Sequence, residues 1–270
     1  MEREEARGKG LWLSIVFRVF AVIFTLSGLF MLQGLSEGLE PWVQGFMASS
    51  PLPDELRFHA AAHGALIGIL FSGSLIVMLR NPLEKPILLQ FYFVGHLVFL
   101  ATLLLTDVKL ALQSFFVFIM FAVVLLLLFV TYGKRRELFR PAETPVRNRT
   151  MLIMTGIALL GLLPVLLNGI IGQVQDPVQQ FRSGESAALS IVMLYGGYLA
   201  ASSRRGSRAL AVLLSLAYLF MGAASITLPD HPGSWGIWGG AASILYGLVY
   251  TWLAFRSKVS HANTAAQASS

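Results

Sequence analysis

The stretch of sequence that decides the fold is residues 109–140, KLALQSFFVFIMFAVVLLLLFVTYGKRRELFR. It contains an apolar run of spanning length, Lys109–Tyr132, followed at once by four basic residues between positions 134 and 140. A helix of about 20 apolar residues is long enough to cross a hydrocarbon layer of about 30 Å. Basic residues at the end of such a helix indicate the cytoplasmic side. We therefore interpret this stretch as a transmembrane helix that ends in the cytoplasm.

The whole chain repeats this pattern of long apolar runs separated by short polar linkers. Of its 270 residues 56% are hydrophobic and only 13% are charged, which is too apolar for a soluble globular domain. The runs are continuously apolar, whereas the strands of a membrane barrel would alternate polar with apolar residues. We therefore predict an all-α polytopic membrane protein with eight transmembrane helices. The expected spans are Leu11–Leu32, Ala60–Leu79, Pro86–Thr106, Lys109–Tyr132, Thr150–Gly172, Ala187–Ser203, Ala209–Leu228 and Trp235–Phe255.

Basic residues are distributed unevenly over the linkers between these spans. Sixteen of the 20 Lys and Arg residues fall on the side that holds both termini, three fall on the other side, and Arg18 lies inside the first span. By the positive-inside rule both termini are expected in the cytoplasm, and the short linkers are typical of a bacterial plasma membrane protein. Because no nucleic-acid motif accompanies the basic groups, the expected partner is the lipid bilayer and not nucleic acid.

The chain is expected to form a single integral membrane domain in two parallel four-helix halves, residues 1–132 and 150–256. A basic cytoplasmic linker, residues 133–149, joins the halves, and a disordered tail, residues 257–270, follows them. The similarity of LLTD before the fourth span to TLPD before the eighth suggests a duplicated unit. The alternative is chance similarity, because apolar helices share one composition.

Small residues spaced four apart allow two helices to approach closely. Gly64 and Gly68 form one such pair, and Gly236 and Gly240 form another. They indicate either a seam between two copies of the chain or helix contacts within one copy. A homo-oligomer, or another membrane protein as partner, is therefore left open.

The second span carries the group of residues with the most chemical promise. Glu55, His59 and His63 follow one another at intervals of four, which places them on one face of a helix. Two histidines at this spacing can chelate a single transition-metal ion. The alternative is that both imidazoles are interfacial side chains hydrogen-bonded to neighbouring helices or to water.

Acidic and amide groups are expected at the same outer face of the membrane, close to these histidines. Nearby carboxylates would favour the charged imidazolium and make such a site sensitive to pH near neutrality. We therefore predict that His59 and His63 line an external pocket with at least one of these groups. The candidates are Asp107, Asn168, Glu185 and Asp230, with Glu55 on the histidine helix itself.

Two further polar residues are predicted to lie inside spans. His96 falls near the middle of the third span, where it is either a proton relay, an axial haem ligand, or the partner of one interhelical hydrogen bond. Arg18 lies about 10 Å into the first span, a depth from which its guanidinium can reach the cytoplasmic headgroups by snorkelling. The alternative for Arg18 is coordination of an anion or a lipid headgroup within the bundle.

No pattern in the chain is a catalytic signature, so an enzyme is not the favoured interpretation. The absence of cysteine excludes disulfides, thiolate ligands and thiol nucleophiles. Two functional classes remain: a small-solute or ion carrier or its accessory subunit, which we favour, and a metal- or haem-binding membrane protein that uses His59 and His63. A membrane scaffold without transport or chemistry is the third. No cofactor is expected in the first class, and a transition metal or haem is expected in the second.

Overall fold

The computed structural model describes residues 2–29, 33–39, 42, 52–140, 147–175 and 181–268, and the side chains of residues 11–256 within these ranges except 33 and 54. Regular structure in these ranges is helical throughout, and no strand occurs in them. The prediction of an all-α chain is therefore confirmed. The longer helices are α1 (Glu2–Leu29), α6 (Pro86–Thr106), α8 (Phe115–Thr131), α10 (Arg149–Gln175), α11 (Ser183–Ala200), α12 (Ser207–Thr227) and α13 (Gly236–Ala268).

The shorter helices connect or interrupt the long ones. They are α2 (Gln33–Gly38), η2 (Asp54–Leu56), α4 (Arg57–His63), η3 (Gly64–Ser72), α5 (Gly73–Leu79), η4 (Pro82–Glu84), α7 (Val108–Gln113) and α9 (Arg135–Phe139). Helix α9 lies in the segment predicted as the basic linker, of which residues 141–146 are outside the described chain. Helix α13 continues to Ala268, into the segment for which the sequence predicts a disordered tail.

Six helices of the described chain are long and apolar enough to cross a membrane. They are Leu11–Leu29, Arg57–Leu79, Pro86–Thr106, Arg149–Gln175, Ser207–Thr227 and Gly236–Arg256. Each agrees with a predicted span to within a few residues. The chain is therefore an all-helical protein with helices of membrane-spanning length and apolarity.

The other two predicted spans differ from these six in ways that have physical causes. The run 109–132 is broken at Ser114 into α7 and α8, which leaves α8 with 17 residues. Helix α11 has 18 residues, but Glu185 and three serines lower its hydropathy. Most of α11 is buried against neighbouring helices. A helix that other helices cover needs no apolar surface toward lipid, so its sequence carries a weaker spanning signal.

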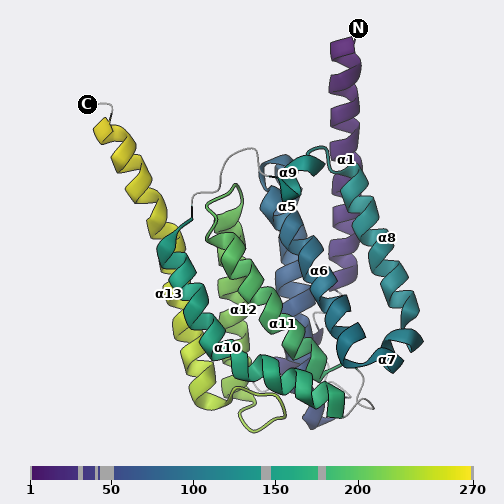
Figure 1. Cartoon of the computed structure of the whole chain (residues 1–270), viewed down its shortest axis with the longest axis vertical. Helices are drawn as coiled ribbons and strands as arrows, with labels where there is room; N and C mark the ends of the chain where they lie inside the picture. The colour runs from purple at the N-terminus through teal and green to yellow at the C-terminus, as the bar shows by residue number, and fades with distance from the viewer. Residues whose placement is uncertain are drawn as a thin grey trace.

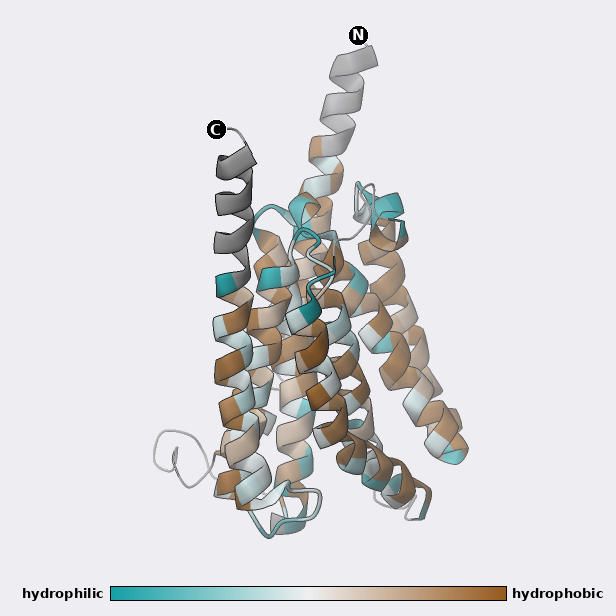
Figure 2. Ribbon diagram, turned by 60° about the vertical axis from the view of Figure 1, so that its left-hand side comes forward, coloured by the Kyte–Doolittle hydropathy of each residue, from teal (hydrophilic) through white to brown (hydrophobic). Residues whose placement is uncertain are grey.

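The long helices form one elongated bundle, with both ends of the chain at the same end of it (Figure 1). Helix α9 lies at that end, whereas α7 and the loop between α12 and α13 lie at the opposite end. Figure 2 shows apolar residues along the shafts of the helices and hydrophilic residues mainly near the two ends. We call the end with α7 the distal end and the end with the termini the terminal end.

The second span changes helix type twice along its length. A 3₁₀ turn, η2, leads into α4, and the nine residues of η3 form a π-helix before α5 resumes the α-helical form. π-helical segments are rare and frequently lie at functional sites. Here the π-helix follows directly after His63, so the widened segment begins where the candidate histidines end.

Several glycines on the predicted small-residue faces pack against helices of the same chain. A Cβ atom built on Gly240 would lie 2.7 Å from the carbonyl oxygen of Gly222, and one on Gly64 would lie 2.7 Å from the backbone nitrogen of Leu35. Backbones that approach this closely leave no room for a side chain. Gly236 has open space around it instead. The tight contacts at Gly64 and Gly240 are thus contacts within one copy of the chain.

Candidate functional site

His63 and Glu185 form the closest polar contact between two helices at the distal end. The imidazole Nδ1 of His63, on α4, lies 2.7 Å from Oε1 of Glu185, on α11. The side chains are 27% and 14% exposed, so water covers little of either group. Hydrogen bonds with an ionised partner are shorter and stronger than neutral ones, and this distance fits such a bond.

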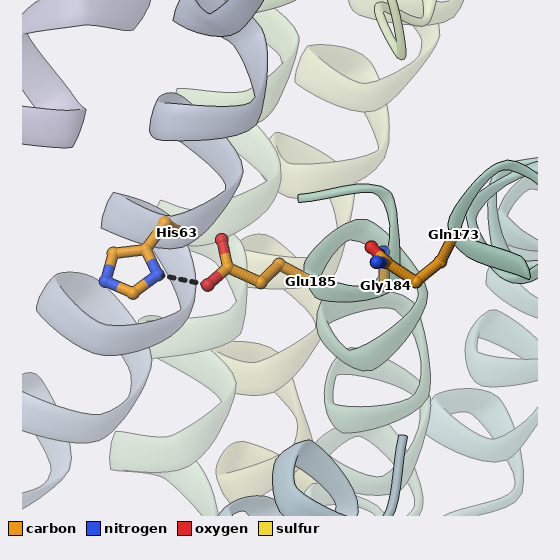
Figure 3. Close-up of polar contacts among 4 residues, drawn as sticks. All are labelled: His63, Gln173, Gly184 and Glu185. Atoms are coloured by element: carbon orange, nitrogen blue, oxygen red, sulfur yellow. Dashed lines mark hydrogen bonds and ion pairs between the residues drawn. The ribbon is translucent and has the colours of Figure 1, made fainter. Parts of the chain in front are cut away.

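The residues around Glu185 extend this contact into a chain of polar groups across three helices. Gly184, next to Glu185, donates its backbone N–H to Oε1 of Gln173 on α10 at 3.0 Å, and Figure 3 shows these residues beside the His63–Glu185 pair. Nε2 of Gln173 lies 3.4 Å from Oδ2 of Asp107. The network therefore joins α4, α11 and α10 to the start of α7 at one level of the bundle.

Asp107 has a structural task at this position. Its Oδ1 accepts the backbone N–H of Leu110 at 2.9 Å, which makes Asp107 the N-cap of α7. An N-cap carboxylate satisfies a backbone donor that the first helical turn would otherwise leave without a partner. Because one oxygen caps α7 and the other faces Gln173, Asp107 is committed to the fold and is not directed at His59 or His63.

His59 lies one turn before His63 on α4 but has different surroundings. It is 7% exposed, and its ring lies close to Arg182 at the start of α11. Its Nδ1 is buried and has no hydrogen-bond partner in the described chain. A Cβ built on Gly233, in the α12–α13 loop, would lie 3.1 Å from Cε1 of His59. The two histidines share a helix, yet His63 bonds with α11 while His59 faces the loop before α13.

A cavity of about 610 Å³ lies next to His59, between the α10–α11 pair and the α12–α13 pair. Helices α10 to α13 all contribute to its wall, and Pro232–Trp235 of the α12–α13 loop line it together with His59. Tyr218 and Tyr246 also line it, with ring centroids 4.4 Å apart. Ligand pockets commonly have volumes of about 300–1,000 Å³, so this cavity has room for a small molecule.

Three residues of the cavity wall carry buried polar atoms without partners. Within the part of the chain that the structure describes, Nδ1 of His59, Oγ of Ser186 and Nε1 of Trp235 make no hydrogen bond. All three residues line the same cavity. A buried polar atom without a partner costs about 1–3 kcal/mol, so such atoms are uncommon in folded proteins and call for an occupant.

The remaining residues of the predicted pocket lie in different places. Asn168 is an exposed residue of α10 and lines the cavity with His59. Glu55 is exposed on the 3₁₀ turn η2, and Asp230 is exposed in the α12–α13 loop. The structure thus brings His63 to Glu185 and places Asn168 in the same cavity wall as His59, but it leaves Glu55 and Asp230 at the surface. That these residues serve a function stays a prediction.

The metal and haem alternative receives no geometric support. Throughout the described ranges, no three His, Asp or Glu side chains come together in a group that could hold a metal ion. His59 faces Gly233 of the α12–α13 loop and His63 is bonded to the carboxylate of Glu185, so the two imidazoles do not converge on one point.

His96 is buried in an aromatic cluster in the middle of the bundle. It is 2% exposed, and its Nδ1 lies 2.7 Å from the backbone oxygen of Tyr92, one turn earlier on α6. Its ring lies 4.0 Å from that of Phe71, 4.1 Å from Tyr92 and 4.8 Å from Phe121, measured between centroids. The imidazole therefore packs against η3 and α8 and is shielded from lipid.

Arg18 lies on the outer surface of the bundle. It is exposed on α1, between the exposed residues Ile15 and Val22 of the same helix. A guanidinium on a lipid-facing surface lowers its energy by extending along the helix toward the headgroups. The exposed position fits snorkelling, and coordination of an anion or a lipid headgroup within the bundle stays the alternative prediction.

The sequence predicted an external pocket with His59 and Asn168 among its residues, but it missed two polar residues of the cavity wall, Ser186 and Trp235. Trp235 stands at the start of an apolar run, so its position indicates an interfacial aromatic residue and nothing more. Ser186 follows Glu185, the residue that draws attention in the sequence. The sequence signals toward the cavity were His59 on the second span and Asn168, four residues after Pro164 in an otherwise apolar helix.

Comparisons of the chain with protein-family models, with curated proteins and with solved structures find no match in any of the three. The functional argument therefore depends on the geometry of the cavity and its surroundings.

Proposed function

We propose that this protein is a membrane carrier that binds a small, uncharged molecule in the cavity between the α10–α11 and α12–α13 pairs. The observation that supports the proposal is the coincidence of a cavity of about 610 Å³ with three unpartnered polar atoms in its wall. An occupant with hydrogen-bonding groups satisfies these atoms when their buried side chains turn toward the cavity.

The chemistry of the wall supports an uncharged ligand. The described lining residues include no Asp, Glu, Lys or Arg, and His59 is the one that can carry a charge. A charged ligand in a cavity of low dielectric would need a counter-charge or a metal, because desolvation of an unpaired ion is very costly. A neutral molecule needs only hydrogen-bond partners, which His59, Ser186 and Trp235 supply.

The proposal includes the arrangement in the membrane that the sequence predicts. In this arrangement α8 and α11 cross the bilayer together with the six longer apolar helices, which gives eight spans in two four-helix halves. Both termini lie on the cytoplasmic side of a bacterial plasma membrane, and the distal end, with His63 and Glu185, faces the outside of the cell. The supporting observation is that both termini lie at one end of the bundle, as an even number of crossings requires (Figure 1).

Cysteine chemistry tests the proposal directly, because the chain contains no cysteine of its own. In Ser186→Cys the new thiol replaces the unpartnered hydroxyl in the cavity wall. In Ser225→Cys, the matched control, the thiol replaces a serine on α12 that is 0% exposed and bonded to the backbone oxygen of Met221. The purified variants are treated in lipid vesicles with methyl methanethiosulfonate, a small uncharged reagent, and their masses are measured.

We expect Ser186→Cys to react at least ten times faster than Ser225→Cys, while both react fully after unfolding. A carrier must also open its cavity to water during its cycle, so the charged sulfonatoethyl reagent should modify Ser186→Cys more slowly but completely. Equal inertness of the two folded variants toward both reagents would remove the cavity as a ligand site. If only the uncharged reagent reacts, the cavity remains a binding site, but the proposal that it opens to water in a transport cycle is contradicted.

A further inference from the structure

The wall of the cavity contains residues that also lie on the outer surface of the bundle. Ile157 and Gly161 of α10 and Ala242 of α13 are exposed, and all three line the cavity. Gly161 lies 12 residues after the start of α10 and 14 before its end, hence about 18 Å from one end at 1.5 Å per residue. The opening between α10 and α13 is therefore at the depth of the hydrocarbon layer.

A bend in α10 explains why this opening exists. Pro164 lies inside the helix, where proline removes one backbone hydrogen bond and kinks the axis. Before the bend, α10 stays beside α13, and the Tyr246 hydroxyl donates to the backbone oxygen of Met154 at 3.0 Å. After the bend α10 turns away from α13 (Figure 1) and reaches Asp107 through Gln173. The two helices separate, and the cavity fills the gap.

Polar and apolar groups are separated along the cavity. At its distal end lie His59, Ser186 and Trp235, the residues with unpartnered polar atoms. Toward the middle of the membrane the wall combines apolar side chains of α10, among them Ile157 and Leu162, with Ser243 and Tyr246 of α13, whose hydroxyls are bonded to backbone oxygens. A ligand that matches both parts has a hydrogen-bonding head and an apolar tail.

The unpartnered atoms also define what the head must offer. Nδ1 of His59 donates or accepts according to the tautomer of the ring, whereas Trp235 Nε1 is a donor only. Ser186 can donate or accept. Hydroxyl and ester groups offer both donors and acceptors, which matches this set of residues. A phosphate would find no Lys or Arg among the described lining residues.

We propose that the cavity binds a neutral single-chain lipid of the monoacylglycerol type, which enters sideways from the bilayer between α10 and α13. The glycerol head lies at the distal end against His59, Ser186 and Trp235, and the acyl chain lies along α10 and extends through the opening into the membrane. This inference rests on the proposed function and specifies its ligand class and its route of entry.

Fluorescence quenching of Trp235 tests the inference, since this side chain lines the cavity. In the reporter variant the other four tryptophans, Trp12, Trp42, Trp238 and Trp252, are replaced by Phe, and its secondary structure and elution volume are compared with those of the unaltered chain. The protein is placed in phosphatidylcholine vesicles with rising fractions of a monoacylglycerol dibrominated near its head. Phosphatidylcholine with the same bromine positions, and the corresponding free fatty acid, are the comparison probes.

Two glycines of α10 provide a matched pair of blocking variants in this reporter. Both Gly156 and Gly161 are exposed and have nothing within 4 Å of a built Cβ, so either position accommodates a larger side chain. Only Gly161 lines the cavity. Gly161→Phe therefore obstructs the opening, whereas Gly156→Phe adds the same side chain to the same helix away from it.

We expect the brominated monoacylglycerol to quench Trp235 along a saturating curve, at fractions at least fivefold lower than brominated phosphatidylcholine. Gly161→Phe should raise the fraction of brominated monoacylglycerol needed for half-maximal quenching at least fivefold, and Gly156→Phe should leave this fraction unchanged. Equal, unsaturated quenching by all probes would overturn the inference, and so would an equal effect of the two Phe variants. Saturable quenching by the brominated fatty acid alone would show that the ligand does not have a neutral head. Modification of Ser186→Cys by both thiol reagents without lipid quenching would refute this inference and leave the proposed function standing.

Discussion

Nδ1 of His63 and Oε1 of Glu185 are 2.7 Å apart although 122 residues separate them in the chain. The contact ties α4 to α11 at the distal end, one turn from His59 and directly beside Ser186 of the cavity wall. Both groups are largely withdrawn from water, so each depends on the other for its hydrogen bond. The pair therefore fixes the position of the two helices that carry His59 and Ser186.

Removal of one partner should show how strongly this pair contributes to the fold. Glu185→Ala leaves the imidazole of His63 without its bond, and we expect the free energy of unfolding to fall by about 1–3 kcal/mol. Glu185→Gln retains a hydrogen-bonding group, so its free energy of unfolding should fall by less. Denaturation followed by circular dichroism in detergent provides the measurement, with Glu55→Gln at the exposed turn η2 as control.

The double variant His63→Ala/Glu185→Ala completes this test. If the two side chains act as a pair, its loss of stability will be smaller than the sum of the two single losses by at least about 0.5 kcal/mol. Strict additivity would show that the contact contributes nothing as a pair.

The sequence predicted this part of the fold better than it predicted the cavity. Apolar length and charge sidedness placed His63 and Glu185 at the same membrane face, because each heads a span that starts on that side. The cavity arises instead from a bend at Pro164 and from the gap between two helix pairs. Such features depend on how helices pack in three dimensions, and no spacing along one helix encodes them.

Local breaks in helices were also beyond the reach of sequence periodicity. Lys109–Tyr132 is apolar enough to suggest one helix, yet the helix breaks at Ser114 into α7, which Asp107 caps at its start, and α8. The regular spacing of Glu55, His59 and His63 predicted one face, but η2 interrupts the helix before His59 and leaves Glu55 exposed. Capping and tertiary contacts outweighed the pattern in both places.

Asp107 should prove structural when it is replaced. Asp107→Ala removes the cap of α7, and loss of an N-cap typically lowers stability by about 1 kcal/mol. Asp107→Asn keeps an oxygen that can accept the N–H of Leu110, so most of the stability should return. Thermal unfolding of both variants distinguishes this role from a functional one. A loss of thiol reactivity at Ser186→Cys in the Asn variant, with unchanged stability, would contradict it.

His96 is expected to tolerate replacement by another ring. Its imidazole packs against Phe71 and Tyr92, and its Nδ1 is hydrogen-bonded to the backbone oxygen of Tyr92 on its own helix. His96→Phe keeps the ring packing, and swaps that conserve shape usually cost less than about 1.5 kcal/mol. His96→Ala should cost more, because it leaves a cavity among aromatic rings. Proton-coupled uptake that disappears in His96→Phe would instead favour the proton relay.

The membrane topology can be tested with sided reporters. One reporter is a fusion after Ser270, following α13, and the other is an insertion at Asp230, an exposed residue of the α12–α13 loop. Helix α13 runs from the distal end, where this loop lies, to the terminal end (Figure 1). Alkaline phosphatase is active only outside the cytoplasm, so we expect activity from the insertion and none from the terminal fusion. A fluorescent protein that matures in the cytoplasm should give the reverse pattern. Activity of phosphatase at both positions would contradict the proposed sidedness.

Replacement by alanine should lower stability at Gly240, which contacts another helix, and raise it at Gly156, which does not. Gly240→Ala places a methyl group against the backbone of Gly222, where a built Cβ is only 2.7 Å from the carbonyl oxygen. Separation of α12 from α13 should then lower stability by about 1–3 kcal/mol. Gly156→Ala meets open space, and alanine favours a helix over glycine by about 0.5–1 kcal/mol, so this variant should be more stable. Chemical denaturation at several protein concentrations measures both effects. Because the Gly240 contact lies within one copy of the chain, the loss of stability in Gly240→Ala should not depend on protein concentration. If Gly240 lay in a seam between two copies, the loss of stability would change with protein concentration.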